Sequence, residues 1–292
     1  MAWMADHVDV RVDTTELLPD ARSVLCVADR YPGGPDASIA GLARIARYAR
    51  GRDYHKGMKK RLHALCDTFK SRWPEHEFRA CVDTAPVLER EVAEAAGIGA
   101  VGKNTMLIQQ GVGSWILLGE IVTTLEIKPN AIVPTDPCGT CTRCIDACPT
   151  DALSSFAMDA TRCISYLTIE HRDVIDRTLH AGMGAWIFGC DICQEVCPHN
   201  QQTTRTVEAP VEPSSGSRAV ALALLEVLDW SAEDRIAAVG GTSATRAKLD
   251  MWRRNAAIAL RNEGPDAATA ARLDVIAADT NEVEMVRDAA TR

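Results

Sequence analysis

The chain has 292 residues, of which 47% are hydrophobic, so it can bury a sizeable core, and its length suggests about two domains. It contains no run of about 18 apolar residues, which excludes a membrane-spanning helix, and its net charge of −8 gives no global indication of a nucleic-acid-binding protein. Eleven cysteines without an N-terminal export signal predict a reducing cytoplasm, in which thiolates serve as metal ligands.

The first part of the chain predicts a short strand and then a basic helical stretch. Val24–Ala28 is a compact apolar run between turn residues, which is typical of a buried strand. Residues 39–69 have helical character, interrupted around Gly51 and Gly57. A basic stripe is usually a solvated helix face, and the alternative is a contact surface for a phosphate backbone. The stripe has Tyr48 and Tyr54 between its members, which are Arg44, Arg47, Arg50, Arg52, Lys56, Lys59, Lys60 and Arg61.

Asp83 stands directly after a predicted strand at residues 78–82 and ahead of a helix predicted over residues 87–96. α/β folds place their chemistry beyond the carboxyl ends of strands. A desolvated acid at such a place can deliver a proton, whereas the simpler alternative is that Asp83 caps the following helix. Its position alone favours the cap.

Two further patterns resemble ligand-binding motifs, but their sequence context does not support a ligand site. Gly97-Ile-Gly99-Ala-Val-Gly102 matches G-x-G-x-x-G, but the dinucleotide fingerprint needs a strand before it and a helix after it, and here a helix precedes. We expect these glycines to form a loop close to a flat ligand. His55 follows Asp53 and Tyr54, and because a lone His beside an acid is a common pattern we assign it no metal-ligand role. Residues 113–124 then predict a strand with a bulge at Gly119.

The cysteines of residues 138–198 form the strongest motif. The first run has the C-x₂-C-x₂-C-x₃-C-P spacing of bacterial ferredoxins, whose fourth Cys ligates the other cluster. The second run has one Cys fewer, and Cys163 completes the set. The spacing predicts two [4Fe–4S] clusters, one bound by Cys138, Cys141, Cys144 and Cys197 and the other by Cys148, Cys163, Cys190 and Cys193.

Zinc sites and disulfides are the alternatives for these cysteines. Structural zinc prefers separate C-x₂₋₄-C pairs, which a three-Cys run ending in Cys-Pro fits poorly, and disulfides rank last. Cys26, Cys66 and Cys81 lie in apolar contexts and are predicted to be inert core residues.

The rest of the chain predicts connections and helices. Residues 129–137 form a linker, residues 166–175 a helix, and the polar residues 203–217 a boundary. Ala-rich helices follow to the end of the chain, and residues 252–260 predict either one helix of an αα repeat or a plain helical cap on the core.

The order of these motifs resembles the epoxyqueuosine reductase family, which uses cobalamin and iron–sulfur clusters to complete queuosine at the wobble position of tRNA. The resemblance covers residues 1–205 closely, and residues 252–262 are similar to the start of that family's C-terminal helical repeats. It is carried by Tyr48–Lys56, Val82–Pro86, Gly102–Asn104, Gly113–Trp115, Leu118–Glu120, the first Cys run, Thr168–Arg172 and Gly189–Pro198.

The resemblance implies an α+β fold. Its parts would be an α/β-like cobalamin-binding catalytic domain at residues 1–130, a ferredoxin-like dicluster insert at 131–205 and a C-terminal α-helical, HEAT-like region at 206–292. It places the proton donor on Asp83 and the cobalamin contacts on Asp83, Ser165, Asp191 and Arg30. The implied cobalamin is base-off, and its cobalt lacks a protein His, which agrees with the view of His55 above.

The implied activity is the reduction of epoxyqueuosine to queuosine. A donor such as flavodoxin or a ferredoxin reductase system would send electrons through both clusters to the cobalt, while Asp83 protonates the epoxide oxygen. The implied partner is the anticodon stem-loop of tRNA, which the basic stripe would contact, and no membrane is expected. The family usually has further helices before Met1 and a longer C-terminal part, so part of the substrate pocket is expected to differ here.

Two rival functions remain. One is another corrinoid and iron–sulfur reductase, similar to reductive dehalogenases, which are usually exported with a twin-Arg signal and use a Tyr acid. The other is a dicluster electron-transfer protein, which would need neither Asp83 nor the Gly102–Asn104 loop nor the basic stripe.

Overall fold

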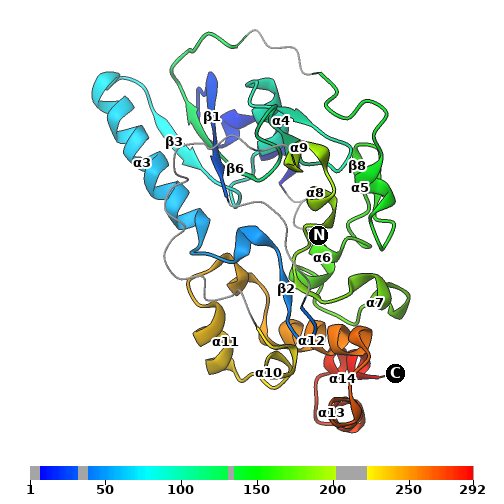
Figure 1. Ribbon diagram of the computed structural model, residues 1–292. Coiled ribbons are helices and arrows are strands. Elements are labelled where there is room, and N and C mark those ends of the chain that lie inside the picture. The colour runs from blue at the N-terminus through cyan, green and yellow to red at the C-terminus, as the bar shows by residue number, and fades with distance from the viewer. Residues whose placement is uncertain (1–6, 32–38, 131–134, 202–221, 292) are drawn as a thin grey trace.

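The computed structural model describes residues 7–31, 39–130, 135–201 and 222–291. A three-stranded antiparallel sheet lies at one end of the molecule, in the order β1 (Ser23–Arg30), β6 (Ile116–Thr123) and β3 (Phe78–Cys81) (Figure 1). The three strands predicted from the sequence are thereby confirmed. Strand β6 is central, and β1 and β3 pair with its two edges, each in the antiparallel direction.

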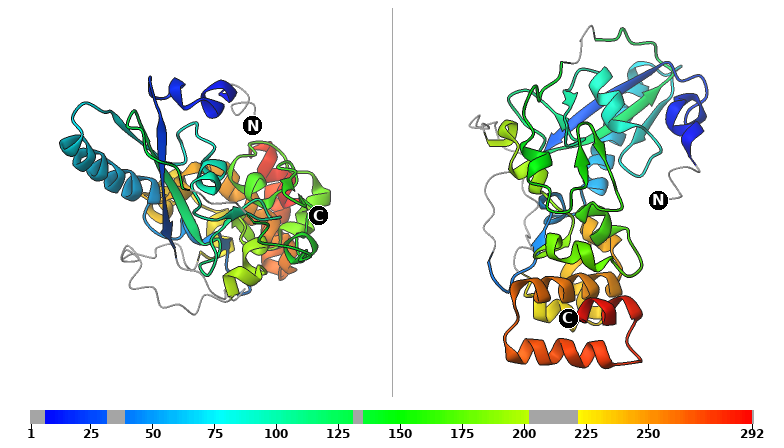
Figure 2. Two further views of the ribbon diagram at one scale, coloured as in Figure 1. Left: turned by 90° about the horizontal axis from the view of Figure 1, so that it is seen from above. Right: turned by 90° about the vertical axis from the view of Figure 1, so that its right-hand side faces the viewer.

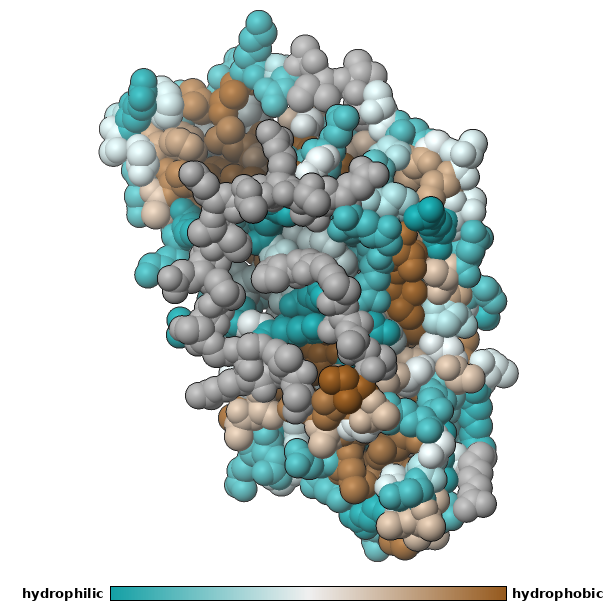
Figure 3. Space-filling model, in the orientation of Figure 1, coloured by the Kyte–Doolittle hydropathy of each residue, from teal (hydrophilic) through white to brown (hydrophobic). Residues whose placement is uncertain are grey.

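Helix α3 (Tyr54–Arg72) covers one face of this sheet, packing Met58 and Leu62 against Ile121. Figure 3 shows hydrophobic residues where the helix meets the sheet. Gly119 permits this close approach, since a Cβ there would lie 2.7 Å from the Met58 sulfur. The ladder between β1 and β6 continues in register through Gly119, so the predicted bulge is wrong.

The opposite face carries α4 (Glu89–Ala95), α2 (Val8–Val12) and the 3₁₀ helix η1 (Thr14–Glu16). Leu17 and Val87 pack there with Cys81 and Val122, and burial raises the pKa of the Cys81 thiol to about 11. Cys66 is also buried, and Cys26 lies partly buried in β1, in agreement with the prediction that these three thiols are inert core residues.

The helix predicted over residues 39–69 is correct only in its second part. Helix α3 begins at Tyr54, where the Asp53 side chain accepts the N–H of His55 at 3.1 Å, and it contains Gly57 without a break. Residues 44–45 instead form strand β2 (Arg44–Ile45), which pairs in parallel with β9 (Trp186–Phe188), followed by η2 (Arg47–Ala49). The helical pattern of this segment was overridden by a partner strand far along the chain.

Short elements connect the sheet to the second Cys run. The helix predicted over residues 166–175 is correct only as far as Ile169, where α6 ends, and the next helix, α7, begins beyond the predicted range at Arg177. These elements are β4 (Ala100–Val101), β5 (Leu107–Ile108), α5 (Arg143–Asp146), β7 (Leu153–Ser154), β8 (Ala157–Met158), α6 (Ile164–Ile169), α7 (Arg177–Met183), α8 (Ile192–Glu195) and α9 (Pro198–Gln201).

Helices form the other end of the molecule, opposite the sheet (Figure 2). They are α10 (Leu224–Leu228), α11 (Ala232–Val239), η3 (Ser243–Arg246), α12 (Leu249–Glu263), α13 (Ala267–Ala278) and α14 (Glu284–Ala290). Their apolar side chains share one buried core with β9, α6 and α7, in which Trp252 stacks on Phe188 with ring centroids 5.4 Å apart. The boundary predicted at residues 203–217 lies outside the described residues, and the HEAT-like repeat stays a prediction.

Within the described residues, no helix has both the length and the apolar character needed to cross a membrane.

Candidate active site and cluster-binding segment

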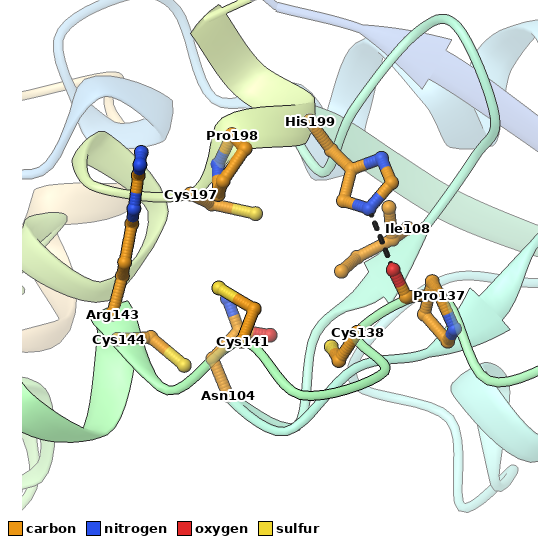
Figure 4. Close-up of a pocket in the computed structure, with 10 residues that line it drawn as sticks. All are labelled: Asn104, Ile108, Pro137, Cys138, Cys141, Arg143, Cys144, Cys197, Pro198 and His199. Atoms are coloured by element: carbon orange, nitrogen blue, oxygen red, sulfur yellow. Dashed lines mark hydrogen bonds between the residues drawn. The ribbon is translucent and has the colours of Figure 1, made fainter.

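The four cysteines predicted for the first cluster line one cavity, and Figure 4 shows their side chains around it: Cys138, Cys141, Cys144 and Cys197. At its rim the His199 ring donates to the Pro137 carbonyl at 2.8 Å, which joins the second Cys run to the start of the first. The C-x₂-C-x₂-C run thus wraps one side and the last Cys of the second run closes the other, which fits the donor set of a cubane cluster.

The other four cysteines also lie near one another. Burial raises the pKa values of Cys190 and Cys193, and charge on neighbouring thiols, including Cys163 for both and Cys148 for Cys193, raises them further. Four ionised thiolates at such a place need a metal centre to neutralise them, because a coordinating metal deprotonates a thiol outright. The donor set again fits an iron–sulfur cluster.

The structure contradicts the disulfide alternative, since all eleven cysteines are free thiols. A zinc site needs ligands that converge on a single ion. Across residues 7–31, 39–130, 135–201 and 222–291, no three His, Cys, Asp or Glu side chains are arranged to hold one. A [4Fe–4S] cluster takes one thiolate on each of its four irons, so its ligands lie farther apart than the ligands of one zinc ion.

The Gly97–Asn104 loop packs against both Cys runs. The backbone N–H of Lys103 donates to the Cys138 sulfur at 3.3 Å, and its ammonium donates to the carbonyls of Gly139 and Cys141 at 2.7 and 3.1 Å. Asn104 donates to the Cys193 carbonyl at 3.4 Å. The helix-before-strand order that excludes a dinucleotide fingerprint is confirmed by α4 and β4. The Gly97–Asn104 loop contacts the two Cys runs. The flat ligand expected beside this loop stays a prediction.

The Gly113-Ser-Trp115 segment fastens the second Cys run from the other side. Ser114 donates its backbone N–H to the Asn200 side-chain oxygen at 2.7 Å and its hydroxyl to Gln194 at 2.9 Å. Gly113 has a left-handed φ of 89°, and a Cβ there would lie 2.1 Å from the Asn200 oxygen. The segment therefore needs glycine at this position for two separate reasons.

Asp83 does not cap α4, so the simpler alternative from the sequence is wrong. The helix begins at Glu89 with Leu88 before it and no side-chain cap. Asp83 has a left-handed backbone with φ of 34°, about half of its side chain is exposed, and its carboxylate lies 2.9 Å from His55 Nε2. Its backbone N–H donates to Glu89 Oε1 at 2.5 Å. Strained backbone at a strand end, held by side chains, is a feature of functional sites.

His55, to which the sequence analysis gave no role, lies between two carboxylates. Its Nδ1 lies 2.7 Å from Asp53, and its Nε2 faces Asp83. The hydrogen bond with Asp83 and, after it, the one with Asp53 raise the pKa of His55, although burial opposes them. Asp53 caps α3 and so places His55 in the first turn of that helix, and strand β3 ends where Asp83 can meet it.

Two partly buried tyrosines, Tyr48 and Tyr54, lie near Asp83 and His55. The Tyr54 ring stacks on His55 with centroids 4.0 Å apart. Burial raises the pKa of Tyr48, and the carboxylates of Asp83 and Asp191 raise it further, so Tyr48 lies within the field of both acids. Asp83 and Asp191 of the second Cys run therefore both lie near the tyrosine pair Tyr48 and Tyr54, which we call the aromatic wall.

The other residues predicted to contact cobalamin lie on or beside three separate elements. Ser165 is half-buried on α6, and Arg30 is half-buried at the end of β1. Asp191 is almost fully buried and accepts the Arg47 backbone N–H at 2.8 Å, so this carboxylate already has a structural partner. Burial raises the pKa of Asp191 to about 6, against the lowering effect of Arg47.

The donor chemistry fits a corrinoid held by its polar edge. Asp83, Tyr48 and Ser165 offer hydrogen-bonding oxygens, whereas both ring nitrogens of His55 are engaged by carboxylates. Both ring nitrogens of His55 thus face carboxylates, and the cobalt without a protein His stays a prediction.

The residues of the predicted basic stripe fall into two groups, one that forms ion pairs inside the protein and one that is exposed. Arg44 and Arg47 donate to Glu195 at 3.0 Å, and Arg44 lies 4.0 Å over the Trp186 ring, so they join β2 to the second Cys run. The exposed members of the stripe are Arg52, Arg61, which pairs with Asp29, and three lysines of α3. We call Lys56, Lys59 and Lys60 the α3 lysine face.

Comparison with known proteins decides the family. Residues 11–84 match the family model described as "Epoxyqueuosine reductase QueG, DUF1730", and residues 137–200 match the "4Fe-4S double cluster binding domain". An epoxyqueuosine reductase of Xanthomonas campestris pv. campestris is 40% identical over 269 residues, which cover 90% of this chain and 75% of that protein. The chain belongs to the epoxyqueuosine reductase family.

Solved structures of epoxyqueuosine reductases agree. One, in complex with a tRNA-Tyr epoxyqueuosine-modified stem loop, has a TM-score of 0.86 at 30% identity and covers 97% of this chain and 75% of that one. Another, from Bacillus subtilis with its catalytic aspartate loop swung out of the active site, has a TM-score of 0.85 at 29% identity, with the same coverage. The mixed α and β fold and the 4Fe–4S segment are thereby confirmed, whereas the cobalamin-binding domain stays a prediction.

Proposed function

We propose that this protein reduces epoxyqueuosine to queuosine in tRNA, with Asp83 as the proton donor. The observation that carries the proposal is the Asp53–His55–Asp83 chain at the end of β3, in a member of the epoxyqueuosine reductase family whose next segment matches a double-cluster domain. The reaction breaks both C–O bonds of the epoxide, consumes two electrons and two protons, and releases the oxygen as water. Asp83 would give a proton to that oxygen.

His55 lets an exposed carboxylate act as an acid. The raised pKa of His55 favours its charged form, and the 2.9 Å contact lets its Nε2 proton pass to the Asp83 carboxylate as Asp83 gives its own proton away. Asp53 then stabilises the ring orientation from the other side, at 2.7 Å. Tyr54, stacked on the imidazole, limits its rotation.

The two reducing electrons must come through cofactors, and the two sets of four cysteines fit iron–sulfur clusters. Cys138, Cys141, Cys144 and Cys197 would hold one [4Fe–4S] cluster, and Cys148, Cys163, Cys190 and Cys193 the other. Asp83, Ser165 and Arg30 would bind the polar edge of a base-off cobalamin, with Asp191 acting through Arg47. Bound together, these groups supply the two reducing electrons from an external donor such as flavodoxin or a ferredoxin reductase system.

The α3 lysine face gives the tRNA a place to bind beside Asp83. Lys56, Lys59 and Lys60 are exposed on the helix whose first turn carries His55. Lysines of this kind contact phosphates and displace counterions, which makes binding salt-dependent. We infer a cytoplasmic location from this substrate.

The experiment uses anaerobically reconstituted protein, cobalamin, a strong reductant and tRNA that carries epoxyqueuosine. Mass spectrometry of digested nucleosides should show the loss of one oxygen, dependent on cobalamin. Asp83→Asn should retain the clusters and bound cobalamin and lose about 10²–10⁴-fold in turnover, the usual range for a general acid. Asp67→Asn, on the exposed side of α3, is the matched control and should have normal activity.

Three results would contradict parts of the proposal. Normal turnover by Asp83→Asn removes the assignment of the proton donor. Bound cobalamin without conversion points to a different substrate, as in the dehalogenase-like alternative. Intact clusters with neither conversion nor cobalamin binding indicate the electron-transfer alternative.

A further inference from the structure

The C-terminal helical region reaches the start of α3. The Asp53 backbone N–H donates to the Gly241 carbonyl at 2.9 Å, and Gly241 lies between α11 and η3. The side chain of the same Asp53 lies 2.7 Å from His55, which faces Asp83. The short helix η3, which ends at Arg246, therefore lies close to the Asp53–His55–Asp83 chain although it is distant from it in sequence.

Arg246 forms a two-point ion pair with Glu170, the residue that follows α6. Its Nε and Nη2 donate to the two carboxylate oxygens at 2.7 and 3.0 Å. The hydrogen bond with Glu170 raises the pKa of Arg246, and the carboxylate of Asp83 raises it further, which agrees with the position of the pair near Asp83. Glu170 belongs to the segment Thr168–Arg172, which contributes to the family resemblance but has no role in the proposed function.

The guanidinium of Arg246 has a second side that is open to solvent. The Arg246 side chain is 52% exposed, whereas that of Glu170 is 22% exposed. A guanidinium carries five N–H donors in a planar fork, and Glu170 takes two of them. Three donors remain on Nη1 and Nη2, and within the described part of the chain no hydrogen bond occupies them. Glu170 thus fixes the plane of the guanidinium and leaves a second two-point edge for a ligand.

This edge matches two oxygens of one phosphate group. The other common partner of an arginine in nucleic acids is the O6 and N7 edge of guanine. Epoxyqueuosine is a 7-deazaguanosine, in which carbon replaces N7, so its base lacks one of these two acceptors. The chemistry of the substrate therefore favours a phosphate as the partner of Arg246.

We propose that Arg246 binds one backbone phosphate at the modified nucleotide of the anticodon loop, and that Glu170 orients its guanidinium. Asp53, Asp83 and Glu170 repel a phosphate that approaches this place, and the positive charge of Arg246 offsets that repulsion. The proposal rests on the tRNA substrate of the proposed function and is independent of Asp83 as the proton donor. The alternative is an ion pair that only joins α6 to η3, although exposed ion pairs contribute little to stability.

The first test measures binding without turnover. Cluster-loaded protein without a reductant is titrated into the epoxyqueuosine-modified stem loop of tRNA-Tyr, and fluorescence anisotropy gives the affinity across a salt series. Arg246→Gln should bind about tenfold more weakly, because it loses a charge-assisted two-point contact. The slope of log K against log salt should become shallower by about 0.7, the value for one phosphate of a single strand.

Two variants control this measurement. Arg246→Lys should keep the native slope, because its charge remains, and should still bind more weakly, because the planar fork is lost. Arg272→Gln removes a guanidinium that donates through the same two nitrogens to Asp229 and is 46% exposed on α13, and it should match the native protein in both affinity and slope. A native salt slope in Arg246→Gln would overturn the proposal.

The second test identifies the phosphate. Stem loops that carry one uncharged methylphosphonate at each loop position in turn are bound to the native protein and to Arg246→Gln. At one position the replacement should weaken binding to the native protein about tenfold and have little further effect on Arg246→Gln, because the two changes remove the same contact. Equal losses in both proteins at every position would leave only the structural ion pair.

Glu170→Gln tests the orienting role, since this variant keeps the cation and releases its plane. The methylphosphonate effect should then spread over neighbouring positions of the loop. An effect of native size that is still confined to one position would refute the role of Glu170.

The same proteins separate this proposal from the proposed function. With turnover, Arg246→Gln should raise KM for the stem loop about tenfold and leave kcat unchanged. If the native protein binds the stem loop with the expected dependence on Arg246 but converts nothing, the proposed reaction fails and the phosphate contact stands. If the native protein converts epoxyqueuosine while Arg246→Gln keeps the native affinity and salt slope, only the phosphate contact is wrong.

Discussion

Replacing Arg254 with Met should release the loop that carries the second cluster. Arg254 has no exposed surface, and its guanidinium donates to three backbone carbonyls, those of Leu167 at 2.7 Å, His171 at 2.8 Å and Asp173 at 2.7 Å. Hydrogen bonds to a charged group contribute about 1.5–3 kcal/mol each, and Met leaves these carbonyls buried without a donor. The loss is on the order of 5 kcal/mol, comparable with the entire stability of a typical domain.

The three carbonyls belong to α6 and to the loop after it, so this part of the chain is destabilised. Helix α6 begins one residue after Cys163. The next residue of α12, Asn255, donates to the carbonyls of Thr168 and Ile187, and the Thr168 hydroxyl accepts the Gly189 N–H at 2.9 Å, next to Cys190. We therefore expect Arg254→Met to lose the second cluster selectively. Anaerobic iron analysis and EPR of the reduced protein should show the content falling from two clusters per chain toward one.

Arg253→Met is the matched control. Arg253 lies on the same helix, but it donates to the Leu228 carbonyl and to Glu282, both within the C-terminal helices. This variant should weaken those helices and retain both clusters. Full cluster content in Arg254→Met, or equal loss of both clusters in the two variants, would refute the view that α12 anchors the second cluster segment.

Three further predictions test other parts of the structure. Lys59→Glu combined with Lys60→Glu should weaken tRNA binding and flatten its dependence on salt, and unchanged affinity in a salt series would contradict the α3 lysine face. Lys103→Met removes a cation that contacts the first Cys run, so an EPR-monitored titration should give a lower reduction potential for one cluster, which Lys70→Met should not. Because burial raises the pKa of Glu120 from 4.5 to about 9, the unfolded chain releases this proton first, and stability should fall with rising pH by about 3 kcal/mol by pH 7. Hydrogen exchange of the β6 amides should show this fall, and its persistence in Glu120→Gln would contradict the assignment.

Features determined by short-range spacing were predictable from the sequence. The cysteine runs have a spacing with one dominant interpretation, and the structure places the four cysteines of the first predicted set around one cavity. Asp83 was identifiable because an apolar strand ends just before it, and β3 confirms that strand.

Features that depend on distant partners were not predictable. Residues 44–45 look helical alone, yet they pair with β9, and two arginines of the supposed stripe bind Glu195. The contact of His55 with Asp83 at 2.9 Å forms only because the sheet brings Asp83 there. Glu120 was visible as part of a family motif, but its burial depends on two strands and α4 together.

The pairing of β2 with β9 affects how the protein is made on the ribosome. Ile45 and Ala49 belong to a core whose other members include β9 and α12, so the amino-terminal half cannot complete its packing until almost the whole chain has emerged. Multidomain chains usually fold their first part during synthesis, and pairing between remote strands slows folding. The cysteine ligands therefore leave the ribosome before α12 is present to close over them. Cells short of iron during this interval should accumulate open chains, which chaperones would hold or proteases remove.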